Sequence, residues 1–278
     1  MERFREEPRG DIRGGRDPGS ELTDMTRRFK NVLNIGFNSL AEYLHSKVAA
    51  FFFIFAALLI YVSLLLGVMA VDQEKRTLID FGLAMSELSI FAFAIFWASM
   101  TIQKEMDTKT IYLILSRPVR RADYIAGKLL GIYLTTAVVY LAVSAIHLSL
   151  LFLKGHSVPG IYFTAVLFSY FKIVIISSIA MLITSFTTSS FSSVLISVMV
   201  WILGHFTSEM KYLLDKLAGV KLYALKFFLF LTPNFQLFNV KDVLSSSGGD
   251  FLKPALYFVS YVTALYFANV FVFRKKEF

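Results

Sequence analysis

The stretch from Gln103 to Gly131 carries an ordered set of charged, apolar and hydroxyl residues between two long apolar runs. The set contains an acidic residue, a threonine, two leucines, a serine, a proline, three arginines and a Gly-Lys pair: Glu105, Thr110, Leu113, Leu115, Ser116, Arg117, Pro118, Arg120, Arg121, Gly127 and Lys128. Leucines can supply an apolar contact surface, and arginines can pair with carboxylates in a defined geometry. These residue types are therefore suited to docking on another protein rather than to breaking a bond.

Two further ionisable residues, Glu87 and Lys172, lie inside apolar runs. A charge at mid-bilayer costs at least ~2.5 kcal/mol on insertion scales, so such residues usually face protein or water. Counted back along a helix at ~1.5 Å per residue, Glu87 lies about 24 Å from Gln103, and Lys172 lies about 18 Å from Thr184. Because these depths are similar, we predict that the two side chains face each other or share a wet cavity. The alternative is that each snorkels separately toward a membrane surface.

No catalytic, nucleotide-binding or metal-binding motif accompanies these residues. Gly127-Lys128 is followed by Leu129, and Ala122 stands where a phosphate-binding loop needs its first glycine. The four histidines lack metal-ligand spacing, and the chain has no cysteine to act as a nucleophile or ligand. We therefore predict a non-catalytic chain that itself holds no cofactor and no metal ion.

The composition places the chain in a membrane, since 56% of its residues are hydrophobic, 17% are charged and its mean hydropathy is +0.62. A hydrocarbon core of ~30 Å is crossed by roughly 20 apolar residues in a helix. The sequence predicts an all-α integral membrane protein with six spans, at Val48–Val71, Leu83–Thr101, Leu129–Leu153, Ile161–Ile183, Phe191–Phe206 and Leu256–Phe273. The fifth run is short but can extend through uncharged residues before Phe191.

Lysines and arginines near the span ends predict the orientation. Basic residues precede the first span and follow the last, which places both termini in the cytoplasm and requires an even number of spans. The apolar run Leu222–Leu231 is too short to cross, so we predict an external or re-entrant helix there. The net charge of +8 does not indicate nucleic acid, because the basic residues flank spans instead of forming a face interleaved with aromatic residues. Anionic lipid head groups are better partners for them.

The region before the first span divides at residue 30. Residues 1–29 are expected to be a disordered charged tail, which would include a vector leader or a mis-called start if the natural protein begins at Met25. Leu33, Phe37, Leu40 and Leu44 then recur at helical spacing. This stripe predicts an amphipathic helix lying in the membrane interface, followed by a transmembrane domain that completes residues 30–278.

The order of residues between Gln103 and Gly131 resembles the first cytosolic loop of ABC-2 type transporter permeases, the membrane subunits of one class of ATP-driven exporters. The family pattern usually reads Glu-x-x-x-Gly-Thr-x-x-x-Leu-Leu-Ser-x-Pro-Val-x-Arg, followed by Gly-Lys. Here Lys109 replaces the usual glycine before Thr110. More loosely, the resemblance extends from Lys30 to the C-terminus. In the family, the segment that matches Thr110–Ser116 and onward forms coupling helices that dock on the nucleotide-binding subunit.

The resemblance implies that the ordered set named above is an ATPase-coupling surface. It also implies a cytosolic ABC ATPase partner that binds ATP and magnesium, and a second copy of this permease or a paralogue. The expected location is the cell inner (plasma) membrane, in contact with its lipids. Two other functions remain open: a stand-alone secondary carrier or channel, and a membrane anchor of an envelope or motility complex.

Overall fold

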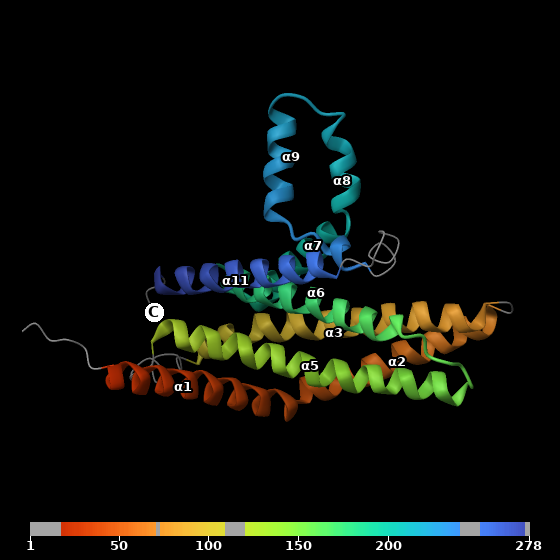
Figure 1. The fold of residues 1–278 in the computed structure, drawn as a ribbon, viewed down its shortest axis with the longest axis horizontal. Coiled ribbons are helices and arrows are strands. Elements are labelled where there is room, and N and C mark those ends of the chain that lie inside the picture. The colour runs from red at the N-terminus through yellow and green to blue at the C-terminus, as the bar shows by residue number, and fades with distance from the viewer. Residues whose placement is uncertain (1–17, 71–72, 109–119, 240–250, 276–278) are drawn as a thin grey trace, which may run out of the picture.

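A computed structural model describes residues 18–70, 73–108, 120–239 and 251–275, and the side chains of residues 18–24 are not described (Figure 1). Within these ranges the chain is helical and contains no strand, which confirms the predicted all-α class. The helices are α1 (Pro18–Leu44), α2 (Lys47–Met69), α3 (Glu74–Asp107), α5 (Arg121–Leu153), α6 (Ile161–Thr184), α7 (Ser190–His205), α8 (Thr207–Leu214), α9 (Val220–Leu231), the 3-10 helix η1 (Phe235–Phe238) and α11 (Leu252–Lys275).

Five of these helices are long and apolar enough to cross a membrane: α2, α3, α5, α6 and α11. A sixth span is formed if α7 and α8 are counted together, although they bend by 62° at the break between them. The predicted six spans are therefore reached only if this bent pair counts as one span. At 34 and 33 residues, α3 and α5 exceed the roughly 20 residues that cross a bilayer. They therefore extend beyond it and carry Glu105 and Lys128 on these extensions.

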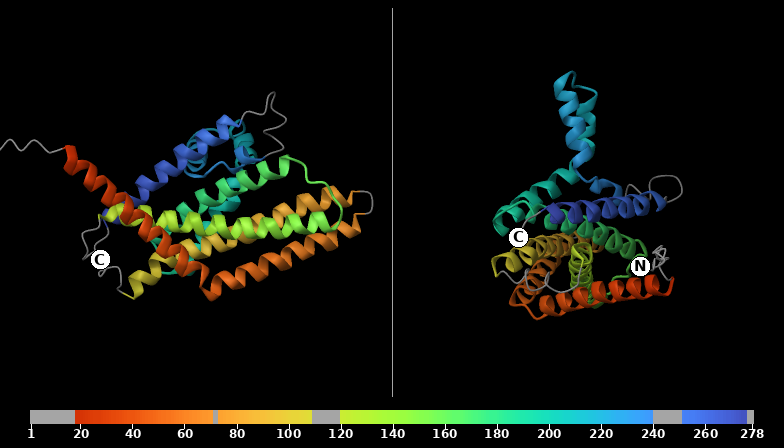
Figure 2. Two further views of the ribbon diagram at one scale, coloured as in Figure 1. Left: turned by 60° about the horizontal axis from the view of Figure 1, so that its bottom comes forward. Right: turned by 90° about the vertical axis from the view of Figure 1, so that its left-hand side faces the viewer.

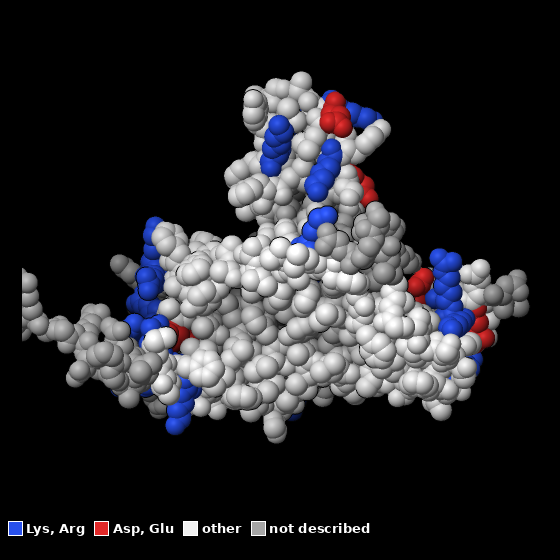
Figure 3. All heavy atoms as spheres, in the orientation of Figure 1, with Lys and Arg blue, Asp and Glu red and all other residues white. Residues whose placement is uncertain are grey.

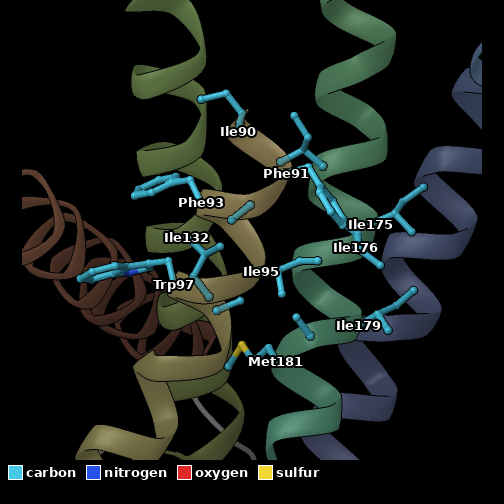
Figure 4. Close-up of a cluster of buried hydrophobic side chains, with 14 of the residues drawn as sticks. Ile90, Phe91, Phe93, Ile95, Trp97, Ile132, Ile175, Ile176, Ile179 and Met181 are labelled. Carbon is cyan, nitrogen blue, oxygen red and sulfur yellow. The ribbon is translucent and has the colours of Figure 1, made fainter. Parts of the chain in front are cut away.

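The core of the bundle lies between α3, α5 and α6 (Figure 4). Phe93 and Ile95 of α3, Ile132 of α5 and Ile176 of α6 are fully or almost fully buried there. By contrast, only 22% of the most apolar window of α2 and of α11 is buried inside the chain. Those two helices are peripheral, so most of their apolar surface is available to lipid.

Helix α1 begins at Pro18, which corrects the prediction that residues 1–29 form a disordered tail. Proline is well suited to a first helical position because it needs no intrahelical N–H bond there. Arg28 also anchors this part of the helix, since its guanidinium pairs with Asp123 of α5 at 3.0 Å. Residues 1–17 lie outside the described part of the chain.

The later part of α1 crosses α5 obliquely (Figure 2). Ser39 is buried in the crossing and Tyr43 is buried against Trp97 and Thr101 of α3. Phe37 and Leu44 of the predicted apolar stripe are exposed on the opposite side of α1. A helix with one face on the protein and apolar residues on the other is typical of the membrane interface.

Helices α8 and α9 form a hairpin that projects away from the bundle (Figures 1 and 2). Its two ends are held together, because Thr207 donates a hydrogen bond to the Asn234 side chain at 2.9 Å and Gln236 donates one to the carbonyl of His205 at 2.8 Å. No residue of α9 is buried. The helix predicted at Leu222–Leu231 is present as α9, its external or re-entrant position stays a prediction, and α8 was not predicted.

Candidate functional site

Charged side chains gather at the two ends of the bundle and on the α8–α9 hairpin, and the middle of the visible face is largely uncharged (Figure 3). Two further groups of charged side chains are largely buried. The first, which we call the junction, is formed by Glu105, Arg121, Asp123, Tyr124 and Lys128 where α3 ends and α5 begins. The second is the ion pair of Glu87 and Lys172 inside the bundle.

At the junction, the carboxylate of Glu105 forms an ion pair with Lys128 and accepts a hydrogen bond from the hydroxyl of Tyr124. The Lys128 and Glu105 side chains are only 7% and 15% exposed. Tyr124 also stacks on Phe273 of α11, with 5.4 Å between ring centroids. These contacts fix the end of α3, the start of α5 and the end of α11 relative to one another.

Arg121 and Asp123 extend the junction to two more helix ends. The Arg121 guanidinium donates to the carbonyls of Phe273 at 3.5 Å and Arg274 at 3.0 Å, in the last turn of α11. A cation is favourable there because the carbonyl end of a helix carries partial negative charge. Asp123 binds Arg28 of α1. Sequence reasoning did not identify Asp123 or Arg28, because their partners are distant in the sequence.

Helix α1 is also tied to α3 beside the junction. The hydroxyl of Tyr43 lies 2.8 Å from that of Thr101, and Lys104 binds Glu42 at 2.8 Å. Burial raises the pKa of Tyr43, so its hydroxyl stays neutral at physiological pH. Helix α1 is thus attached to both α3 and α5 near the junction.

The remaining members of the predicted coupling set have different positions. Arg120 is exposed at the position that precedes α5. Gly127 lies at the crossing with α1, where an added Cβ would be 2.6 Å from the Cβ of Ile35. A coupling role for Gly127 would therefore act through packing. Thr110, Leu113, Leu115, Ser116, Arg117 and Pro118 lie outside the described residues, so their role stays a prediction.

Inside the bundle, the structure brings Glu87 and Lys172 together as an ion pair, as the sequence predicted, instead of leaving them to snorkel separately. Their side chains are 15% and 12% exposed. Ser169 donates a hydrogen bond to Glu87, and Nε2 of His205 lies 4.0 Å from the Glu87 carboxylate. Ser169 stands three residues before Lys172 and so was detectable as a neighbour on the same helix face. The position of His205 had no such signal, because it depends on how α7 packs.

The ion pair lines a cavity of about 430 Å³ between α3, α6 and the segment around η1. Phe235 and Phe238 supply part of its apolar wall, and Gln236 adds a polar group. Over the ranges that the structure describes, no group of three or more His, Asp or Glu side chains is arranged to hold a metal ion. The chemistry available here is therefore charge pairing and hydrogen bonding.

Comparison with known proteins bears on both places. No curated protein matches the sequence. The sequence profile described as ABC-2 family transporter protein matches residues 83–278, which is more than half of the chain. The match includes the intramembrane ion pair and the whole connection from α3 to α5. This multi-pass membrane protein therefore belongs to the ABC-2 transporter family.

Proposed function

We propose that this chain is the permease subunit of an ABC transporter and moves its substrate with energy from ATP hydrolysed by a separate cytosolic subunit. Membership of the ABC-2 family supports a permease. The observation that supports coupling to a separate ATPase is the junction. Its buried polar contacts join the helix ends on both sides of the 109–119 connection. A partner that moves the connection would thereby move α3 and α5 together.

The proposed mechanism is rigid-body transmission. The partner binds ATP and magnesium, closes during its cycle and displaces the connection. The Glu105–Lys128 pair holds α3 and α5 together. Arg121 connects the end of α11 to α5, and Asp123 connects α1 to α5 through Arg28, so these helices move with the connection. Two permease copies with two ATPase subunits would then alternate between inward-open and outward-open arrangements. In this proposal the chain forms the substrate pathway and transmits the motion, and the partner hydrolyses ATP.

A secondary carrier is the second candidate, because intramembrane ion pairs often belong to ion or substrate pathways. Glu87 and Lys172 are such a pair. A carrier would transport in response to an ion gradient with no ATPase present. The ATP dependence of transport therefore separates the two functions.

The proposed docking surface is tested by Arg120→Glu, because Arg120 is exposed beside the connection. Arg121 is unsuitable for this purpose, since its reversal would also break its contacts with α11. Lys75→Glu at the opposite end of α3 is the matched control, because Lys75 is equally an exposed cation.

We expect Arg120→Glu to weaken copurification of the ATPase by about tenfold, as loss of one charge-assisted contact would. Membrane insertion should be unchanged, and Lys75→Glu should behave as wild type. Full partner binding and full substrate-stimulated ATP hydrolysis in Arg120→Glu would show that the coupling surface is elsewhere.

A further inference from the structure

The cavity of about 430 Å³ beside the intramembrane ion pair has the size of a small-molecule site, which is typically ~300–1,000 Å³. Small side chains of α3 and α6 line part of it: Ala84, Ala165 and Ser169. Glu87 and Lys172 lie beyond them on the same two helices, and Asp80, which forms an ion pair with Arg76, also lines the cavity. A ligand in this cavity would therefore meet both charges of the ion pair.

His205 adds a directional hydrogen-bonding group to this site. Its Nδ1 lies 2.9 Å from the carbonyl oxygen of Trp201, and a carbonyl can only accept, so Nδ1 carries the proton. In the neutral ring, Nε2 is then an acceptor, and it lies 4.0 Å from the Glu87 carboxylate. Glu87 and His205 thus offer two acceptors to a cation, whereas Lys172 offers an ammonium to an anion.

The balance of charge decides which ligand can bind there. A purely anionic ligand that drew Lys172 away would leave Glu87 as an uncompensated charge in the membrane, which is strongly unfavourable. A purely cationic ligand would leave Lys172 in the same condition. A head group that carries both signs replaces each partner of the ion pair and leaves neither charge unpaired.

We propose that this cavity binds a ligand whose head group carries both an ammonium and an acid group. Glu87 and His205 hold the ammonium, Lys172 holds the acid group, and Phe235 and Phe238 contact any apolar substituent. An ammonium that bears N–H groups is preferred over a quaternary one, because both acceptors need hydrogen-bond donors. As a substrate class, this assignment rests on the proposed permease function, but binding itself needs no ATPase.

The test is direct titration of the purified full-length chain in an uncharged maltoside detergent. Trp201 is a built-in reporter, because its ring lies 4.3 Å from the ring of His205, centroid to centroid. Lysophosphatidylethanolamine is the main probe. Lysophosphatidylglycerol and an alkylamine of equal chain length carry one sign each, and lysophosphatidylcholine carries both signs without N–H donors.

We expect lysophosphatidylethanolamine to bind at least about tenfold more tightly than the two single-sign probes, and more tightly than lysophosphatidylcholine. Free phosphoethanolamine separates two sources of the head group. Equal competition by it indicates a soluble zwitterion, and competition only by the chain-bearing probe indicates a lipid. Equal binding of all the amphiphiles, or no binding of any zwitterion, would overturn the proposal.

Two variants locate the site without breaking the ion pair. Ala165→Leu fills the cavity and should abolish zwitterion binding, whereas Ala145→Leu, exposed on α5, is the matched control. His205→Phe should remove the preference for ethanolamine over choline. Wild-type binding by Ala165→Leu would place the ligand elsewhere and refute the assignment. Arg120→Glu should bind the zwitterion normally, so failure of ATPase coupling and failure of this site are distinguishable.

Discussion

At the scale of residues, the charged groups of this protein differ in burial and therefore in what their loss costs. Exposed pairs such as Arg76–Asp80 and Lys104–Glu42 contribute about 0–1 kcal/mol each, because water screens them. Breaking a buried pair by removing one partner costs about 3–5 kcal/mol, because a charge is left without compensation. Glu105–Lys128 belongs to the buried class.

Glu105→Gln should therefore destabilise the protein far more than Glu42→Gln, its exposed control on α1. We expect a loss of about 3 kcal/mol for Glu105→Gln and below about 1 kcal/mol for Glu42→Gln. Tyr124→Phe keeps the stacking on Phe273 and should cost about 1 kcal/mol through its lost hydrogen bond. Unfolding by denaturing detergent in mixed micelles measures all three. Equal losses of unfolding free energy in Glu105→Gln and Glu42→Gln would show that the junction does not hold α3 and α5 together.

The Glu87–Lys172 pair is tested by a double-mutant cycle, with Glu87→Gln, Lys172→Met and the combination. Each single change leaves one charge in the membrane, so the double variant should be more stable than the sum of the single losses implies. A coupling energy of about 1–3 kcal/mol is expected for groups in contact. Strictly additive losses would mean that the two side chains act independently.

At the scale of elements, the crossing of α1 and α5 explains Gly127, which the sequence could assign only by resemblance, and Gly131, for which the sequence predicted no role. Gly127 and Gly131 are four residues apart on α5, and each meets α1 closely. An added Cβ would lie 2.6 Å from Ile35 at the first position and 2.6 Å from Ser39 at the second. Small residues at this spacing allow helices in membranes to approach closely.

Gly127→Ala should lower the free energy of unfolding by about 1–3 kcal/mol, since overpacking outweighs the helix preference of alanine. Gly160→Ala is the control, because an added Cβ there meets nothing within 4 Å. It should be neutral to within about 0.5 kcal/mol. The same detergent titration compares them. A Gly127→Ala protein as stable as wild type would contradict the close crossing.

Elements set by local hydropathy were predictable, and elements set by contacts between distant residues were not. The apolar runs at Val48–Val71 and Ile161–Ile183 closely match α2 and α6, because bilayer thickness fixes their length. The start of α1 was missed, since its anchor Arg28 pairs with a residue on α5. The bend after His205 was also missed, because it is held by Asn234 and Gln236 beyond the hairpin. Of the two predicted sites, the ion pair followed from depth counting, but His205 did not.

At the scale of the whole molecule, the spans place the junction and the start of α3 at opposite ends of the bundle (Figure 1). The excess of basic residues on the junction side predicts that this side is cytoplasmic. The absence of cysteine makes the prediction simple to test, since single cysteines can be introduced without a background.

Cysteines replacing exposed Lys75 and Ser157 should react with a membrane-impermeant maleimide in intact cells. Cysteines replacing exposed Asp107 and Ser189 should react only after the membrane is opened. Denatured samples serve as the control for total reactivity. Labelling of Ser189→Cys from outside would mean that the link between α6 and α7 is external, and the six-span arrangement would fail.

The central claim, that this permease works with a separate ATPase, is tested most directly by purifying the chain from its native membranes in mild detergent and measuring ATP hydrolysis. We predict that a nucleotide-binding subunit copurifies, that the complex hydrolyses ATP, and that Arg120→Glu lowers the copurified activity by about tenfold while remaining folded. A folded chain that purifies without any ATPase, and that transports in liposomes on an ion gradient alone, would contradict the account.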